Sequence, residues 1–205
     1  LIYLSRFLLT ATVFINVVIY NRVSNAALHS SLIVFAIQEI YSALGSTPFF
    51  AVQINAAKQK TLSPDGVGRV AQSGWLMAIV LGLLGIVPAI FMKQIMSFFS
   101  EDEKIIVDTA KTFQSEIPGM IAFTLFSCNA ALLIALQKTG ILFLASMVGA
   151  VVGVSLNFIL SNGLWGAPDL GVQGLGYSHS IQLWLSCVIS FAFLFRTNLL
   201  DAYSF

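Results

Sequence analysis

Charged residues are scarce in this 205-residue chain: Asp, Glu, Lys and Arg together make up 9% of it, whereas 58% is hydrophobic. A soluble domain carries about 25% charged residues, so this chain has too few to cover a surface that faces water. The mean hydropathy of +0.89 and the apolar runs along the whole length predict an integral membrane protein, whose first partner is the lipid bilayer. The net charge of +1 offers no basic field for nucleic acid.

Cysteine and catalytic motifs are equally sparse. Cys128 and Cys187 both lie inside apolar runs, where cysteine is most often a small packing residue. The sequence has no CxxC pair and no His/Cys cluster that would predict a metal site. It also lacks a P-loop, HExxH, GxSxG and a pair of catalytic carboxylates. We therefore expect no enzyme activity, no cofactor and no resident metal.

Long apolar runs are what the sequence does have, and a membrane-spanning helix needs ~20 mostly apolar residues. The runs do not alternate as the ~10-residue strands of a membrane barrel do, so we predict helices. The expected fold is an all-α membrane protein, a six-helix transmembrane bundle in a single domain, residues 1–205. Its helices are expected at about residues 1–20, 28–52, 70–91, 113–136, 141–160 and 175–195.

The start of the chain is an apolar run. It begins at Leu1 with neither a basic n-region nor a small-residue cleavage site, which predicts no cleaved signal peptide. A chain that opens inside a helix hints at a fragment. Six helices with both ends on one side could form one half of a two-fold repeated transporter, which binds its substrate between the halves.

Lys and Arg are distributed unevenly over the connections between the predicted helices. One side carries Arg6, Lys58, Lys60, Arg69, Lys138 and Arg196. The other side carries Arg22, Lys93, Lys104 and Lys111, diluted by Glu101, Asp102, Glu103, Asp108 and Asp169. Because cytoplasmic connections carry the excess of Lys and Arg, we predict that both termini are cytoplasmic and that the acidic connection lies outside.

Helix-breaking residues recur inside the spans. Gly45, Thr47 and Pro48 interrupt the second predicted helix, Pro88 the third and residues 118–119 the fourth. Broken spans are tolerated where the freed carbonyls line a cavity or meet a neighbour, and an ordinary kink is the alternative. Their repetition favours a moving, transporter-like bundle over a static anchor.

Two carboxylates fall within the spans, where an ionisable group costs ~2.5 kcal/mol or more and usually faces a cavity or a partner. Glu39, in FAIQEIYSALG, lies deep in the second predicted helix. It is either a functional carboxylate that faces a cavity or a buried group paired with a neighbouring helix. Glu116, in FQSEIPGM, lies near the outer start of the fourth predicted helix, and we expect an interfacial residue.

Uncharged polar residues and one histidine complete the candidates. Asn157 and Ser161 are four residues apart and share a helix face. Taken singly, these two and Asn16 predict interhelical hydrogen bonds, which contribute ~0.6–2 kcal/mol each. His179 can change charge near physiological pH, so a functional role and a structural one are equally open.

Four segments of the chain are informative together: NFILSNGLWGAPDLGVQGLGYSHS, FINVVIYNRVSNAALHSSLIVF, ALGSTPFFAVQINAA and IPGMIAFTLFSCNAALLIALQKTG. They resemble parts of the N-terminal six-helix lobe of the multidrug and toxic compound extrusion (MATE) transporters. In the same order, these parts are the junction of the fifth and sixth helices, the junction of the first and second, the end of the second helix, and the fourth helix with its turn. The order and spacing of these segments carry the resemblance over nearly the whole chain.

The resemblance implies a cation site. In this family two lobes form a V-shaped cavity, and organic cations leave in exchange for Na⁺ or H⁺. Many members place one carboxylate late in the first helix and an Asn plus a second carboxylate in the fifth. A small polar residue of the sixth helix often joins them. The matching positions here are Asn16, Asn157, Ser161 and His179, which are expected to approach one another within the bundle.

This sequence departs from the family at that site. Asn157 matches, but Asn16 and Ser161 stand where Asp is expected, and His179 stands where Thr is usual. Without a carboxylate, cation binding there should weaken. A proton cannot be carried on Asn or Ser, so His179 or Glu39 would have to carry it if this lobe handles protons.

The resemblance therefore implies one half of a secondary antiporter in the bacterial inner membrane, with small organic cations or drugs as substrates. Its further partner would be a second six-helix lobe, from a missing C-terminal half or another subunit. Two alternatives stay open. A lipid-linked saccharide flippase of the same superfamily is disfavoured by the few Lys and Arg in the spans. A degenerate, non-transporting scaffold is favoured by the missing acids and the missing second lobe.

Overall fold

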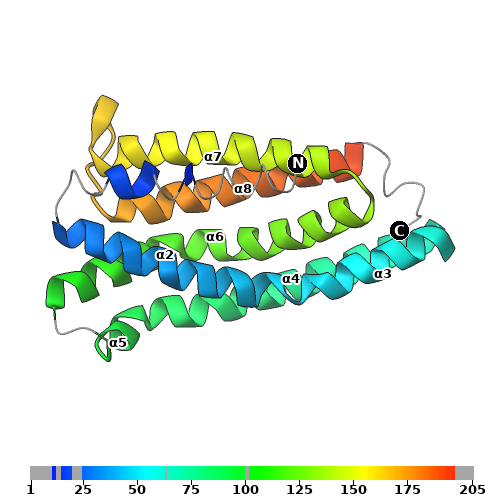
Figure 1. Cartoon of the computed structure of the whole chain (residues 1–205), viewed down its shortest axis with the longest axis horizontal. Helices are drawn as coiled ribbons and strands as arrows, with labels where there is room; N and C mark the ends of the chain where they lie inside the picture. The colour runs from blue at the N-terminus through cyan, green and yellow to red at the C-terminus, as the bar shows by residue number, and fades with distance from the viewer. Residues whose placement is uncertain (1–10, 13–14, 20–24, 63, 100–101, 197–205) are drawn as a thin grey trace.

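The computed structural model describes residues 11–12, 15–19, 25–62, 64–99 and 102–196. All regular structure within these ranges is helical, with no strand among them. Figure 1 shows the helices side by side along one long axis. The named elements are α2 (Asn25–Ser46), α3 (Phe49–Leu62), α4 (Pro64–Ile90), α5 (Met92–Met96), α6 (Glu103–Ala135), α7 (Thr139–Ser161), η1 (Leu164–Gly166) and α8 (Gln173–Arg196).

Five helical stretches in the described part of the chain are long and apolar enough to cross a membrane. They are Leu28–Leu62, Gly66–Ile90, Glu103–Ala135, Thr139–Ser161 and Gln173–Phe195. These stretches correspond to the second to sixth predicted helices, and the all-α membrane fold is confirmed. The first predicted helix, residues 1–20, lies largely outside the described residues, although 15–19 are helical.

One helix, α6, begins well before its predicted start. The fourth predicted helix was expected to begin near residue 113, but α6 begins at Glu103. Its first turn is capped by Asp102, whose side chain accepts hydrogen bonds from the backbone N–H groups of Lys104 and Ile105. This part of α6 buries Ile106 and Ala110 while exposing charged residues. A search for long apolar runs does not detect such an amphipathic stretch.

The predicted break in the second helix is confirmed at residues 47–48, between α2 and α3. Proline has no N–H to donate. The hydroxyl and the backbone N–H of Thr47 both donate to the carbonyl of Ala43, at 2.5 Å and 3.2 Å. This closes the last turn of α2 before the chain changes direction into α3.

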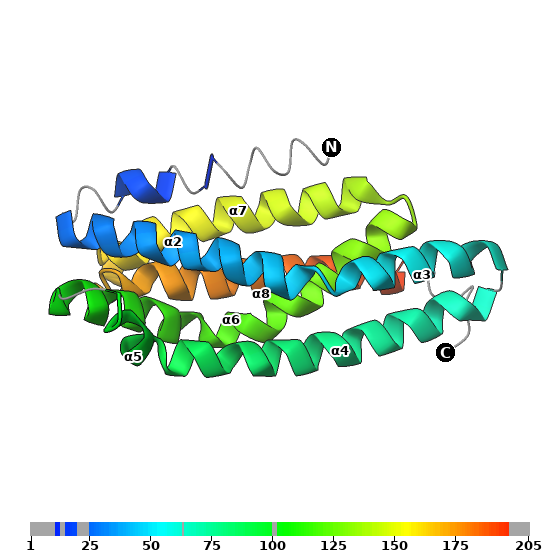
Figure 2. The ribbon, with the colours of Figure 1, turned by 60° about the horizontal axis from the view of Figure 1, so that its bottom comes forward.

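Pro88 and Pro118 were expected either to interrupt their helices or to make ordinary kinks, and neither proline ends its helix. Pro88 lies inside α4 and Pro118 inside α6. Figure 2 shows that α6 bends along its course instead of ending. At the proline, the indole N–H of Trp184 on α8 donates to the carbonyl of Pro118 at 2.7 Å. A proline that kinks a helix is tolerated where a neighbour binds the backbone there.

α6 is the central helix of the bundle: it contacts α2, α3, α4, α5, α7 and α8. A cluster that includes Phe49 and Leu132 joins α3, α4 and α6. A second cluster that includes Val34 and Phe113 joins α2, α4, α5 and α6. The outer surface is apolar too, and α4 exposes Leu76, Ile79, Val80, Leu83, Leu84 and Val87. Such a surface fits a bilayer, not water.

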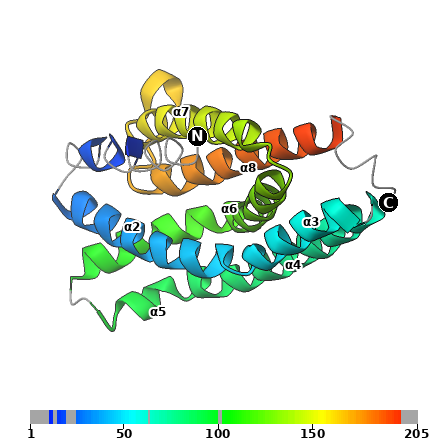
Figure 3. The same ribbon diagram turned by 45° about the vertical axis from the view of Figure 1, so that its right-hand side comes forward.

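The connections between helices gather at two opposite ends of the bundle (Figures 1 and 3). The α3–α4 turn, the α6–α7 turn and the C-terminal end of α8 lie at one end. The α5–α6 and α7–α8 connections lie at the other end. This division separates Lys58, Lys60, Arg69 and Lys138 from the acidic group that includes Asp102, Glu103 and Asp169. Arg6, Arg22 and Glu101 lie outside the described residues. Which end faces the cytoplasm stays a prediction.

Candidate binding cavity

A cavity of about 410 Å³ opens among α2, α3, α6, α7 and α8. Aromatic side chains from three of these helices make much of its wall: Phe35, Phe49, Phe50, Phe113, Phe123 and Phe126. The titratable residues in its described lining are Glu39, Tyr41, Glu116 and His179, and that lining contains no Lys or Arg. The cavity therefore combines an aromatic, apolar wall with many uncharged polar side chains and two carboxylates.

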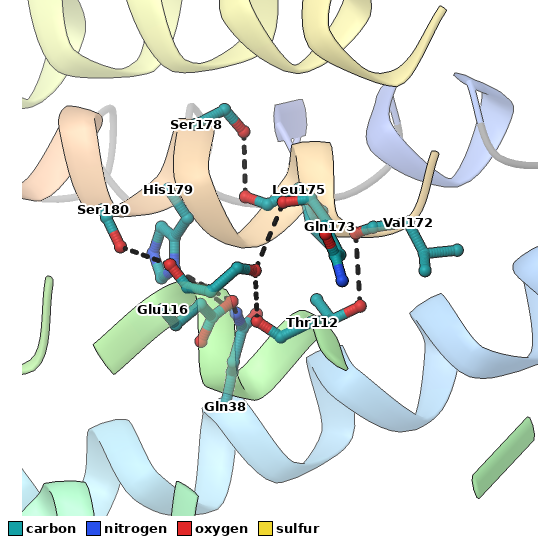
Figure 4. Close-up of polar contacts among 10 residues, drawn as sticks. Gln38, Thr112, Glu116, Val172, Gln173, Leu175, Ser178, His179 and Ser180 are labelled. Carbon is teal, nitrogen blue, oxygen red and sulfur yellow. Dashed lines mark hydrogen bonds and ion pairs between the residues drawn. The ribbon is translucent and has the colours of Figure 1, made fainter. Parts of the chain in front are cut away.

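Glu116 on α6 is the most deeply placed charged group of this cavity, with 5% of its surface exposed. The side-chain amide nitrogen of Gln38, on α2, donates a hydrogen bond to Oε1 of Glu116. Nδ1 of His179, on α8, lies 3.5 Å from the same oxygen and 3.3 Å from Nε2 of Gln38. Figure 4 shows the three side chains converging from three helices. We call these three residues the Glu116 cluster.

Glu116 is buried between helices, and its expected place near the membrane interface stays a prediction. It lies 13 residues after Glu103, where α6 begins, which is about three and a half turns into the helix. Small residues around it also allow α8 to come close. A side chain at Gly119 would meet the backbone of Ser180, and one at Gly176 would meet the Thr112 carbonyl.

Hydroxyl groups hold α6 and α8 together beside the Glu116 cluster (Figure 4). Ser180 donates to the carbonyl of Ser115 at 3.2 Å. The Ser115 hydroxyl lies 3.2 Å from the carbonyl of Gln173, and the Thr112 hydroxyl lies 3.2 Å from that of Val172. These contacts set the position of α8 along α6, and with it the position of the His179 imidazole next to Glu116.

Asn16, Asn157 and Ser161 come together as predicted, in a second buried group. Nδ2 of Asn157 donates to Oδ1 of Asn16 at 2.7 Å, and the Ser161 hydroxyl donates to Oδ1 of Asn157 at 2.9 Å. Asn157 and Ser161 are 1% and 3% exposed. This group, which we call the Asn157 cluster, links residue 16 to α7.

His179 was expected to join the Asn157 cluster, and this expectation was wrong. Its described contacts are with Gln38 and Glu116. The part of α8 that meets Ser161 is Gly174, where a Cβ would lie 2.5 Å from the serine hydroxyl. His179 lies five residues further along α8, more than one turn away, so it faces α6.

Glu39 follows Gln38 on α2, contributes to the cavity lining and is exposed. An exposed side chain does not fit the interpretation of a buried pair with a neighbouring helix. The cavity-facing interpretation remains. Gln38 was not identified from the sequence. The sequence did contain one signal for this part of the cavity: the run of small and hydroxyl residues around Glu116 indicates that another helix comes close there.

A cavity between long apolar helices, bounded by bent and broken segments and containing a buried carboxylate, is typical of secondary transporters. Residues 2–159 match the family model described as MatE. The chain belongs to this family, and it is an integral membrane protein.

Two bacterial relatives carry the name "Probable multidrug resistance protein NorM". The one from Xylella fastidiosa (strain 9a5c) is 30% identical over 132 residues, which cover 62% of this chain and 27% of that protein. The one from Photorhabdus laumondii subsp. laumondii is 24% identical over 196 residues, which cover 94% of this chain and 43% of that protein. The chain thus spans less than half the length of these relatives.

Solved structures share the fold. A MATE crystal structure in the bent conformation matches 93% of this chain and 42% of its own, with a TM-score of 0.83 and 14% identity. A MOP superfamily transporter from Pyrococcus furiosus, described as having a binding pocket of reverse polarity, matches 94% of this chain and 42% of its own. Its TM-score is 0.84 at 13% identity. The family resemblance seen in the sequence is confirmed.

Proposed function

We propose that this chain forms one lobe of a MATE-type antiporter that exports organic cations or drugs in exchange for Na⁺ or H⁺. The observation that carries the proposal is the charge of the cavity: Glu39 and Glu116 line it, and its described lining has no Lys or Arg. Aromatic walls suit the apolar body of such a cation, and a carboxylate suits its charge. The names of the NorM relatives support the same substrate class.

A second six-helix lobe is part of the proposal, from the remainder of the protein or from another subunit. Transporters of this kind bind substrate between two repeated lobes, and the aligned NorM relatives are more than twice as long as the matched region. The membrane is proposed to be the bacterial inner membrane, because both of these relatives are bacterial.

The charge of the cavity also separates this function from the alternatives. A flippase for lipid-linked saccharides must hold phosphate groups, which calls for Arg or Lys. The described lining supplies carboxylates instead. A non-transporting scaffold has no need of a buried carboxylate, which costs free energy unless it is paired.

Transport of a cationic and an anionic dye tests the proposal. The protein at its natural length is reconstituted into liposomes loaded with ethidium or with carboxyfluorescein, and a Na⁺ or an H⁺ gradient is imposed separately. We expect ethidium efflux under one of the two gradients, abolished when an ionophore dissipates it, and no efflux of carboxyfluorescein. Efflux of the anion would favour the flippase. Correctly inserted protein that moves neither dye would be a scaffold.

A further inference from the structure

We propose that Glu116 and His179 together form the proton-carrying site of this lobe, with Gln38 as the positioning residue that distinguishes its two protonation states. The inference rests on the proposed transport function and names its coupling ion. It moves the carrier away from the Asn157 cluster, which holds no acid, to a pair on α6 and α8.

The first step is the burial of Glu116. A carboxylate that is 5% exposed must be paired or hydrogen-bonded, because an unpartnered buried charge is very costly. Gln38 donates to it, and the imidazole of His179 lies 3.5 Å away. His179 is 31% exposed at its side chain, so it connects the buried carboxylate to the cavity.

The second step is the hydrogen bonding of Gln38. A side-chain amide has two N–H donors, and Nε2 of Gln38 faces Oε1 of Glu116 and Nδ1 of His179. A donor can bond Nδ1 only when that nitrogen carries no proton. In the unprotonated state of the pair, Gln38 donates to both partners, and a carboxylate lies beside a neutral imidazole with a net charge of −1.

The third step is what one added proton does. A proton on Nδ1 of His179 turns this nitrogen into a donor, and Oε1 of Glu116 at 3.5 Å is the acceptor it faces. The N–H of Gln38 that faces Nδ1 then opposes another N–H. Rotating the amide by half a turn does not help, because its oxygen would face the carboxylate oxygen. Protonation therefore breaks the contact between Gln38 and His179, which is the direct link between α2 and α8, while Gln38 still donates to Glu116. The pair becomes neutral.

The two states differ in their attraction for a cation. The unprotonated pair presents one negative charge beside the aromatic wall, and the protonated pair presents none. Because opposite charges attract more strongly inside a protein than in water, the unprotonated pair binds a cation more tightly. By thermodynamic linkage, a bound cation must also expel the proton. One proton enters as one monovalent cation leaves, so charge balances.

The other charged and titratable groups of the described cavity lining do not form a second buried pair that could carry the proton. From α2, Glu39 is exposed, and Tyr41 lines the cavity with a hydroxyl that has no hydrogen-bond partner among the described residues. The described lining contributed by α3 and α7 is uncharged, and α4 contributes none of it. Besides His179, α8 presents uncharged side chains such as Gln182.

The test measures binding and proton release together. Tetraphenylphosphonium is titrated into the purified protein at its natural length by calorimetry in two buffers of different ionisation enthalpy, between about pH 5 and 8. The difference in heat gives the protons released per bound cation. For the wild type we expect release to rise towards about one proton, and affinity to fall, as pH decreases.

Each variant has its own expected result. Glu116→Gln should weaken cation binding by about tenfold or more at the alkaline end, because the negative charge is lost. His179→Gln should lose both the proton release and the weakening of cation binding in acid. Gln38→Ala removes the donor of the neutral imidazole, so the loss of affinity should begin at a higher pH. Glu103→Gln, an exposed acid at the start of the same helix, is the control and should match the wild type.

The outcomes separate this inference from the transport function. Unchanged proton release in His179→Gln, or unchanged affinity in Glu116→Gln, overturns the proton site while cation binding stands. Wild-type protein that binds no cation at any pH overturns the proposed function itself. Gel filtration establishes that each variant is folded. Should Glu116→Gln not fold, His179→Gln decides alone, since its side chain is partly exposed.

Discussion

At the scale of single residues, the two polar clusters in the bundle have different chemistry. The Asn157 cluster consists of neutral amide and hydroxyl groups that bond one another, which is what a structural link needs. The Glu116 cluster contains a carboxylate and an imidazole, which can exchange a proton. We infer that the Asn157 cluster links the helices and that the Glu116 cluster exchanges the coupling proton.

The structural role of Asn157 predicts a loss of stability in Asn157→Ala. The substitution leaves Asn16 and Ser161 without their shared partner inside the bundle, and a buried polar group left unsatisfied costs about 1–3 kcal/mol. We expect a lower thermal unfolding midpoint in detergent. Ser155→Ala, on the exposed side of the same helix, is the control and should change the midpoint little. Equal unfolding midpoints for the two variants would show that Asn157 does not stabilise the bundle.

Glu39 gives a prediction about function alone. Because it is exposed at the cavity, Glu39→Gln should leave the unfolding midpoint unchanged while lowering the rate of ethidium efflux. The carboxylate there attracts the cation without being part of the buried pair. Wild-type efflux from a well-expressed Glu39→Gln protein would show that this charge does not act on the substrate.

Part of the site could be predicted from the sequence at this scale. The spacing of Asn157 and Ser161 predicts a shared helix face, and the structure joins them. The pairing of Glu116 with His179 could not be predicted, because it depends on the register of α8 against α6. That register is set by contacts between distant segments, such as Ser180 with the Ser115 carbonyl.

At the scale of helices, glycines on α8 determine how close it lies to its neighbours. Gly176 faces Ser115 and the backbone of Thr112, and Gly174 faces Ser161. A rigid backbone neighbour cannot rotate away as the end of a side chain can. The position of the imidazole of His179 therefore depends on small residues one turn earlier in α8.

Gly176→Ala tests this dependence. The added methyl group would overlap Ser115 and the Thr112 carbonyl, and overpacking of this kind costs about 1–3 kcal/mol. We expect a lower unfolding midpoint. Gly140→Ala is the matched control, because no atom lies within 4 Å of the added Cβ and alanine favours a helix by up to about 1 kcal/mol. The idea of a close contact fails if Gly176→Ala is as stable as Gly140→Ala.

The sequence predicted the existence of these helices better than their ends. Apolar runs located the second to sixth spans, because a bilayer demands about 20 apolar residues. The extension of α6 back to Glu103 was not predicted, and the continuity of α4 and α6 through Pro88 and Pro118 was only one of two alternatives. The extension depends on neighbouring helices, which cover the buried face of an amphipathic stretch.

At the scale of the whole molecule, the fold sorts the charged connections into two groups at opposite ends of the bundle (Figure 1). The sequence alone could only assign these connections to alternating sides by counting spans. The structure brings the α3–α4 and α6–α7 turns to the same end, where Lys58, Lys60, Arg69 and Lys138 are found. Because cytoplasmic connections are enriched in Lys and Arg, this end is predicted to face the cytoplasm.

Cysteine labelling from outside intact cells tests that orientation. Lys60→Cys places an exposed thiol at the basic end, and Glu103→Cys places one at the acidic end. The native Cys128 and Cys187 are buried, so a membrane-impermeant maleimide should leave them unlabelled. We expect Glu103→Cys to react in intact cells and Lys60→Cys to react only after the cells are opened. The reverse pattern would place the acidic end in the cytoplasm and would mean that charge balance does not orient this bundle. Glu116 lies on the first half of α6, nearer that acidic end, so the expected pattern would also place the proposed proton site towards the outer side of the membrane.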